Sequence, residues 1–154
     1  MAKEIERKFI VKPRDWNAMA RGVTIRQGYL AATEKHSVRV RVYGDKAYIA
    51  IKGATVGATR DEFEYEIPLA DANQILDRLC ETAPIDKVRY RIPFEGHTFE
   101  VDIFDGVNKG LNVAEVEMKS ADEKIALPEW IDREITGDPR YFNSNLSLKP
   151  FTTW

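Results

Sequence analysis

Segments in which polar and apolar residues alternate recur along most of the chain. In the first, residues 4–11, charged side chains occupy alternate positions and would share one face of a β-strand, because successive strand side chains point to opposite sides. Alternation of this kind, bounded by turn residues, predicts eight strands. They span residues 4–11, 25–30, 37–42, 46–52, 62–67, 87–92, 98–103 and 111–119.

Helical periodicity is confined to a few places. Residues 69–81 carry apolar side chains at helical spacing and are predicted to form the one longer helix. A shorter helix is predicted over residues 13–21, ending at Gly22. The tail, residues 120–154, is expected to form short helices and turns, because its prolines interrupt any longer helix and Ser120 can cap one.

The order of these elements predicts the fold. Consecutive strands joined by short turns pair as antiparallel hairpins, and closing the sheet into a barrel removes its unpaired edges. We therefore expect an α+β protein, mainly antiparallel β, built as an eight-stranded closed β-barrel with a few short helices outside. Because the chain shows no linker, low-complexity tract or internal repeat, residues 1–154 are expected to form a single domain.

The charged faces of the predicted strands are sorted by sign. Same-sign residues on one face repel each other, so such faces need a compensating partner. The basic faces carry Arg39, Arg41, Lys52, Lys87, Arg89 and Arg91. The acidic faces carry Glu4, Glu6, Glu62, Glu64, Glu66, Glu100, Asp102, Glu115 and Glu117.

Two interpretations of this sorting remain open. The charged faces could form a wet outer surface on which the signs of neighbouring strands cancel. Alternatively they point into the barrel, where buried charges are tolerated when they pair or hold ligands and metals. Carboxylates bind Mg²⁺ together with phosphate oxygens, and Arg and Lys bind phosphate directly. A lumen with both kinds of side chain would complement a polyphosphate with bound metal.

Composition argues against some classes of partner and indicates a compartment. The chain has 23 basic and 25 acidic residues, so its net charge of −2 gives no basis for binding nucleic acid or an anionic membrane surface. The single cysteine, Cys80, cannot form an internal disulfide, which fits a reducing compartment. No signal segment or long apolar run is present. We therefore expect a cytoplasmic protein.

An ordered series of charged motifs resembles the CYTH family of triphosphate tunnel metalloenzymes. A lone E-x-E-x-K motif would be a weak indication, whereas seven motifs in order over nearly the whole chain are specific. The motifs are E-x-E-x-K (Glu4, Glu6, Lys8), R-x-R (Arg39, Arg41), a strand-ending Lys52, E-x-E-x-E (Glu62, Glu64, Glu66), K-x-R (Lys87, Arg89), E-x-D (Glu100, Asp102) and E-x-E (Glu115, Glu117).

The resemblance implies an eight-stranded antiparallel tunnel that binds a triphosphate and one or two Mg²⁺ or Mn²⁺ ions. Members of the family include inorganic, nucleoside and thiamine triphosphatases and class IV adenylyl cyclases, and this chain looks most similar to short bacterial triphosphatases. One departure is Ala50, where many relatives have threonine. It removes a hydroxyl contact but leaves Lys52 in place.

The resemblance also implies roles for the charged residues. The triphosphate would be bound by Lys8, Arg39, Arg41, Lys52, Lys87, Arg89 and Arg91. The first metal would be held by Glu4, Glu6 and Glu117. A second metal or the attacking water would lie nearest to Glu64 and Glu115. The remaining expected metal ligands are Glu62 and Asp102.

The candidate catalytic residues are Lys8, Tyr29 and Glu64. Lys8 would contact a terminal phosphate or assist a proton transfer, or it would only form a salt bridge to the glutamates beside it. Tyr29 is a candidate partner of Lys8, although an aromatic residue next to a glycine often serves packing. No histidine or cysteine spacing typical of zinc is present.

Three functions are consistent with this pattern. The favoured one is metal-dependent hydrolysis of inorganic tripolyphosphate or a nucleoside triphosphate, a reaction that needs mainly positioning and charge neutralisation from the protein. The alternatives are a class IV type adenylyl cyclase, for which no adenine pocket is identifiable, and a non-catalytic polyphosphate or nucleotide-binding module. The expected partners are a small triphosphate and, because the apolar barrel exterior exceeds what few helices can cover, a second copy of the chain in a homodimer.

Overall fold

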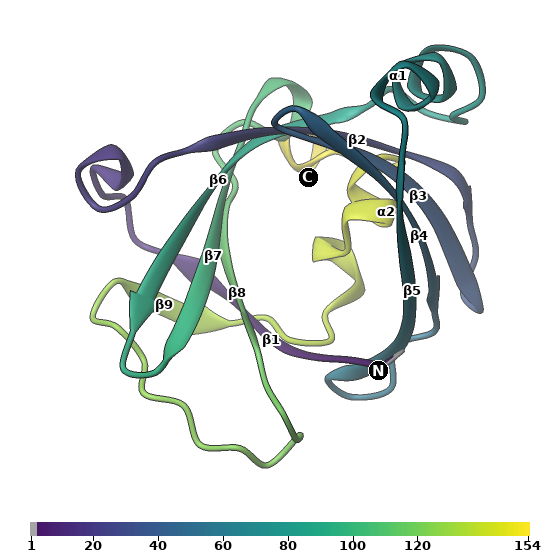
Figure 1. Ribbon diagram of the computed structural model, residues 1–154. Helices are drawn as coiled ribbons and strands as arrows, with labels where there is room; N and C mark the ends of the chain where they lie inside the picture. Colours follow the sequence, from purple (N-terminus) through teal and green to yellow (C-terminus); the bar gives the residue numbers. More distant parts are fainter. Residues whose placement is uncertain (1–2) are drawn as a thin grey trace.

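The computed structural model describes residues 3–154, and its strands form one antiparallel sheet that closes on itself (Figure 1). Around the ring the order is β5-β4-β3-β2-β6-β7-β8-β1, with β9 added beside β1. The strands are β1 (Lys3–Val11), β2 (Val23–Ala32), β3 (His36–Tyr43), β4 (Lys46–Gly53), β5 (Thr59–Ile67), β6 (Ile85–Phe94), β7 (His97–Phe104), β8 (Asn112–Glu117) and β9 (Ile131–Glu134).

The first strand closes the barrel. One edge of β1 pairs with β8, and the N-terminal part of its other edge pairs with β5 at Glu4 and Arg60. Beyond that contact β5 diverges, and the same edge of β1 pairs with β9 from Phe9 to Val11. The predicted closed barrel of eight antiparallel strands is therefore confirmed, and β9 is an additional strand that lies outside the ring.

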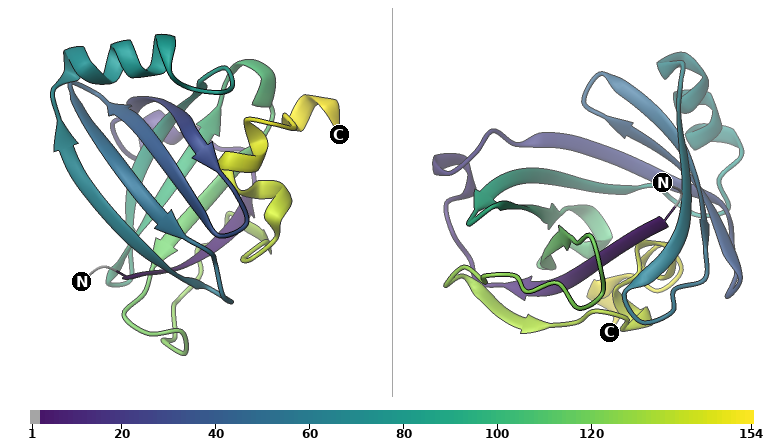
Figure 2. Two further views of the ribbon diagram at one scale, coloured as in Figure 1. Left: turned by 90° about the vertical axis from the view of Figure 1, so that its right-hand side faces the viewer. Right: turned by 60° about the horizontal axis from the view of Figure 1, so that its bottom comes forward.

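The predicted longer helix is present as α1 (Leu69–Arg78), which lies outside the barrel against β3 and β4 (Figure 2). Its buried residues Ala72 and Leu76 pack with Val40 and Ala47 of the sheet. A Cβ at Gly28 of β2 would lie 2.7 Å from Cys80 Sγ, just after the helix. The glycine therefore permits the close approach between β2 and the end of the helical segment.

Two predictions for the remaining segments are wrong. Residues 13–21 form only one 3₁₀ turn, η1 (Trp16–Ala18), because Trp16 is held edge-to-face against Trp130, with ring centroids 5.1 Å apart. Tertiary packing of this aromatic pair outweighs the weak helical pattern. Ser120 caps no helix; its hydroxyl donates to Asp122 in a loop that leads to β9.

The C-terminal segment places its short helical elements at one end of the barrel (Figure 1). It contains η3 (Pro139–Tyr141), α2 (Asn143–Leu146) and η4 (Phe151–Thr153), and α2 lies across one end of the ring in Figure 1. Asp138 accepts a hydrogen bond from the Arg140 backbone N–H and so caps η3, with Pro139 in its first turn. The short η2 (Gly106–Asn108) connects β7 to β8.

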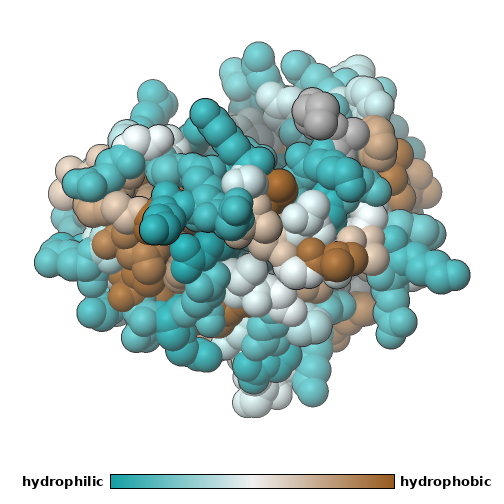
Figure 3. All heavy atoms as spheres, turned by 90° about the horizontal axis from the view of Figure 1, so that it is seen from below, coloured by the Kyte–Doolittle hydropathy of each residue, from teal (hydrophilic) through white to brown (hydrophobic). Residues whose placement is uncertain are grey.

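More of the apolar barrel exterior is covered by other parts of the chain than the sequence predicted. Val40 and Val101 are fully buried, the first under α1 and the second in a cluster with Trp16 and Trp130. On β5, however, Phe63 and Tyr65 are 44% and 58% exposed. The face shown in Figure 3 is largely hydrophilic, with hydrophobic atoms in separate patches. The homodimer remains a prediction, and its contact would involve the uncovered part of β5.

No helix within residues 3–154 has the length and apolar character needed to cross a membrane.

Candidate active site in the barrel lumen

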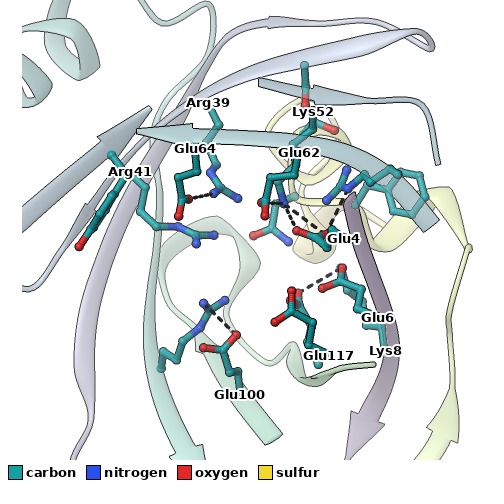
Figure 4. A pocket seen from close by; sticks show the side chains of 18 of the residues that line it. Glu4, Glu6, Lys8, Arg39, Arg41, Lys52, Glu62, Glu64, Glu100 and Glu117 are labelled. Carbon is teal, nitrogen blue, oxygen red and sulfur yellow. Dashed lines mark hydrogen bonds and ion pairs between the residues drawn. The ribbon is translucent and has the colours of Figure 1, made fainter. Parts of the chain in front are cut away.

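The barrel encloses a cavity of about 330 Å³, and all eight ring strands contribute side chains to its wall (Figure 4). The charged faces of the strands point into this cavity, and their apolar faces pack outward against η1, α1, β9 and the loops. Of the two interpretations that the sequence left open, the wet outer surface is therefore excluded. The charges are interior and are not fully screened by water.

The predicted phosphate-binding cations meet in this cavity. They come from four strands, and the members are Lys8 on β1, Arg39 and Arg41 on β3, Lys52 on β4, and Lys87, Arg89 and Arg91 on β6. Most of these side chains are buried, whereas Arg91 is 61% exposed, as expected for a residue at a mouth. Cations from separate parts of the chain thus line the same cavity.

Glu4 lies at the centre of a buried ion-pair cluster. Lys52 Nζ is 3.0 Å from Glu4 Oε2 and 3.1 Å from Glu62 Oε2, and Arg60 Nε is 3.3 Å from Glu4 Oε1. Burial raises the pKa of Glu4, but the opposing effect of Lys52, Glu62 and Arg60 is larger and lowers it to about 2. Glu4 is therefore ionised at neutral pH.

Asp102 differs from the other predicted metal ligands because it is fully buried and does not line the cavity. Its carboxylate accepts hydrogen bonds from Arg89 Nε at 2.7 Å and Arg89 Nη2 at 2.9 Å, and it lies 2.7 Å from Lys87 Nζ. Burial raises the pKa of Asp102, and the two cations overcome this and lower it to about 2. This geometry favours a role in holding Lys87 and Arg89 over one in metal binding.

Glu6 and Glu117 are the two cavity carboxylates without a cationic partner among residues 3–154. They face each other in register on β1 and β8. Burial and the nearby Glu115 and Glu4 raise the pKa of Glu6 well above its usual range. Burial, Glu4 and Glu100 raise the pKa of Glu117.

These uncompensated carboxylates fit a divalent cation, because oxygen ligands of this kind suit Mg²⁺ or Mn²⁺ and the bound charge would relieve their repulsion. As the side chains stand, no three acidic, histidine or cysteine residues within 3–154 converge as a ligand set. Glu4, Glu62, Glu64, Glu100 and Glu115 are engaged by side-chain cations instead. A metal would therefore replace part of these internal ion pairs.

Lys8 and Tyr29 both line the cavity but have separate partners. Lys8 Nζ is 3.4 Å from Glu115 Oε1 and 3.5 Å from the carbonyl oxygen of Tyr141. Burial lowers the pKa of Lys8, but Glu115 and Glu6 raise it further than burial lowers it, so the amine is charged. The Tyr29 hydroxyl is 3.3 Å from Gln27 Nε2.

Glu64, the third candidate catalytic residue, lies on β5, whereas Lys8 lies on the neighbouring strand β1. The Glu64 Oε2 is 3.1 Å from Arg39 Nη2, and the Glu64 side chain is 39% exposed. Lys8 and further cations outweigh burial and hold the pKa of Glu115 well below its usual range. Both carboxylates are ion-paired and face the cavity.

The charged motifs did not include Arg60 and Asn143, which line the cavity, or Gln27, which is buried behind its wall. Arg60 continues the alternation of Glu62 and Glu64 and could have been found by extending that strand, which a glycine-containing loop concealed. Gln27 and Asn143 carry no charge and gave no comparable signal, yet both hydrogen-bond to cavity cations.

Comparison with known proteins agrees with this architecture. The family model described as the CYTH domain matches residues 2–145. An inorganic triphosphatase of Acetivibrio thermocellus is 51% identical over 98% of this chain and 97% of its own length. An inorganic triphosphatase of Nitrosomonas europaea is 35% identical over 94% of this chain and 97% of its own length. A solved structure described as an inorganic triphosphatase superposes with a TM-score of 0.66 at 32% identity, covering 94% of this chain and 97% of that one.

A match of the family model to nearly the whole chain and two full-length relatives above 30% identity confirm the resemblance seen in the charged motifs. The chain belongs to the CYTH domain family.

Proposed function

We propose that this protein hydrolyses a triphosphate in its barrel lumen, that inorganic tripolyphosphate is the preferred substrate, and that the reaction requires Mg²⁺ or Mn²⁺. Two relatives that align over nearly their full length are inorganic triphosphatases, which supports this substrate over a nucleotide. Polar and charged groups make up most of the cavity wall, with Tyr29, Tyr43, Tyr48 and Phe142 as its aromatic members.

One observation carries the proposal: a closed barrel holds several Arg and Lys side chains and a set of carboxyl groups around the same cavity. A polyphosphate chain presents many closely spaced negative oxygens, which Arg and Lys side chains bind directly. We assign this binding to Arg39, Arg41, Lys52, Lys87 and Arg89, with Arg91 at the exposed mouth. Before binding, several of these cations pair with carboxylates of the cavity. Substrate phosphate would displace those carboxylates, so the paired cations would have an anionic partner both with and without substrate.

We expect Glu4, Glu6 and Glu117 to hold a divalent ion. Among residues 3–154 the latter two have no side-chain cation as partner, and Glu4 lies beside them. Glu62, Glu64 and Glu115 would complete the sphere of a second ion or orient water. When bound, the ion supplies neutralisation of charge on the phosphoryl oxygens. Asp102 is left out of this set, since it is sealed behind Lys87 and Arg89.

Lys8 is the candidate for a terminal phosphate contact or for proton transfer, and Glu64 for orienting the attacking water. Both proposals are supported by side chains that line the same cavity. Tyr29 is proposed to assist Lys8, although its hydroxyl now contacts Gln27. Phosphoryl transfer depends mainly on positioning and electrostatics, so these groups would set the alignment of water and phosphate.

The test is to incubate purified protein with Mg²⁺ or Mn²⁺ and tripolyphosphate, ATP or thiamine triphosphate, and to assay phosphate, pyrophosphate and cyclic AMP. We expect one phosphate and one pyrophosphate per tripolyphosphate, with a higher kcat/KM than for ATP. Cyclic AMP with pyrophosphate from ATP would overturn the assignment in favour of a cyclase. Metal-dependent binding of tripolyphosphate without turnover would instead indicate a binding module.

A further inference from the structure

Two neutral amide residues lie where the C-terminal segment covers one end of the barrel. Gln27 on β2 is fully buried, and Asn143, the first residue of α2, lines the cavity. Asn143 does not cap its helix, because Phe142 occupies the cap position and makes no side-chain hydrogen bond there. The Asn143 amide is therefore directed to the lumen and not to its own helix.

The two amides link a pair of cations through a continuous chain of hydrogen bonds. Asn143 Oδ1 accepts from Lys87 Nζ at 2.9 Å and from Gln27 Nε2 at 3.0 Å. Gln27 Oε1 in turn accepts from Arg41 Nε at 2.9 Å. The chain thus connects β6, α2, β2 and β3 at one end of the cavity.

The two cations differ in their other partners, because Lys87 also pairs with the buried Asp102 at 2.7 Å. Arg39, Lys52, Arg89 and Lys8 face carboxylates, which cancel much of their charge. Within residues 3–154, Arg41 forms no ion pair and is held by a neutral amide oxygen. An amide acceptor satisfies and orients a cationic donor while leaving its charge available to a ligand.

Uncompensated positive charge is accordingly concentrated at Arg41. Burial lowers the pKa of Arg41 to about 9, and the neighbouring Arg39 and Arg89 contribute to the same shift. An anion would bind here with a more favourable free energy than at positions where it must first displace a carboxylate. Binding of the most negative part of the substrate at this end follows from that difference.

We propose that Gln27 and Asn143 are positioning residues that aim Arg41 and Lys87 at the substrate without neutralising them, and that they thereby direct one end of the triphosphate toward α2. This inference rests on the proposed function and adds to it a part for the C-terminal segment in substrate binding. The two residues act through the cations.

The test uses nearly isosteric changes that add one carboxylate beside each cation. Asn143→Asp and Gln27→Glu are expected to raise KM for tripolyphosphate by roughly tenfold or more, because a buried like charge repels the incoming phosphate. We expect kcat to change by less than about threefold, since neither residue belongs to the proposed set of reacting groups. Asn17→Asp is the matched control, because its Oδ1 accepts from Tyr90 outside the cavity and the same charge is added.

A second measurement makes the result independent of turnover. Titration calorimetry with tripolyphosphate and no divalent metal should show weaker binding in the order wild type, Asn143→Ala, Asn143→Asp, with Asn17→Asp equal to wild type. Equal binding by wild type and Asn143→Asp would overturn the positioning role even if the enzyme hydrolyses tripolyphosphate. Failure of the wild type itself to bind tripolyphosphate would overturn the proposed function instead, so the two failures are distinguishable.

Discussion

Arg89 and Asp102 face each other in register on β6 and β7 and form a two-pronged hydrogen bond, with Nε–Oδ1 at 2.7 Å and Nη2–Oδ2 at 2.9 Å. The carboxylate has no exposed surface and also contacts Lys87 Nζ at 2.7 Å. One buried anion therefore holds two cations of the proposed phosphate site. Its charge cancels only part of theirs, which leaves the pair suited to a second anion.

This arrangement predicts the effect of Asp102→Asn. Removing the anion leaves the buried Lys87 without this ion pair and Arg89 with only the partly exposed Glu100, so we expect a loss of about 3–5 kcal/mol in the free energy of unfolding. Urea unfolding measures it. Added pyrophosphate should stabilise the variant more than the wild type, because the ligand replaces the missing charge.

Glu100→Gln is the matched control on the same strand. Glu100 is 30% exposed and pairs with Arg89 and Arg91 at 3.4 and 3.9 Å. The expected loss is less than about 1 kcal/mol, as for partly solvated ion pairs. A loss for Asp102→Asn no larger than that of Glu100→Gln would contradict the anchoring role.

The raised pKa of Glu6 predicts that the stability of the protein depends on pH. Burial and neighbouring carboxylates raise this pKa well above the usual range, so the folded state binds this proton more tightly than the unfolded state. As pH rises from the unfolded pKa toward the raised folded pKa, the unfolded state loses its proton first and stability falls. Glu6→Gln removes this loss and should therefore stabilise the metal-free protein at neutral pH.

The measurement is the difference in Tm between Glu6→Gln and wild type at several pH values. The difference should be small near pH 4.5, grow as pH increases, and shrink when Mn²⁺ is added to the wild type. A constant difference across this range would show that Glu6 titrates normally in the folded protein.

Glu117→Gln separates metal binding from folding. Glu117 lines the cavity, is exposed and pairs with no cation within residues 3–154, so the fold should keep its Tm to within a few degrees. Loss of a metal-binding carboxylate should lower kcat by roughly a hundredfold or more. Chelation with EDTA should abolish wild-type activity, and Mn²⁺ should raise the Tm of wild type but not of the variant. Full activity in Glu117→Gln would remove it from the metal site.

Tyr29→Phe decides between catalysis and packing for this residue. If the hydroxyl assists proton transfer by Lys8, its loss should lower kcat by about a hundredfold with little change in KM. Lys8→Met should give at least as large a loss, and its combination with Tyr29→Phe should be no worse than Lys8→Met alone. A change in kcat of less than about threefold in Tyr29→Phe would show that the ring serves packing and that the hydroxyl serves only its contact with Gln27.

Much of the fold was predictable because strand periodicity is local. The alternation in segments such as Glu62–Glu66 indicates which side chains share a face of a strand. The opposite, apolar faces must be buried away from water. The predicted helix over residues 13–21 failed because Trp16 is placed by Trp130, more than a hundred residues away in the chain. β9 was missed because four residues are too few to show a period.

For the site, the sequence alone determined which charges share a strand face, since a period of two assigns each residue to a face whatever its neighbours are. The closed barrel decided that these faces turn toward the lumen. Only the tertiary structure decided which charges meet: Lys52 with Glu4, Asp102 sealed behind Arg89, and Asn143 of the tail brought to Lys87. Those partners depend on the register and closure of the whole barrel and on the path of the C-terminal segment. Strand periodicity carries no information about either.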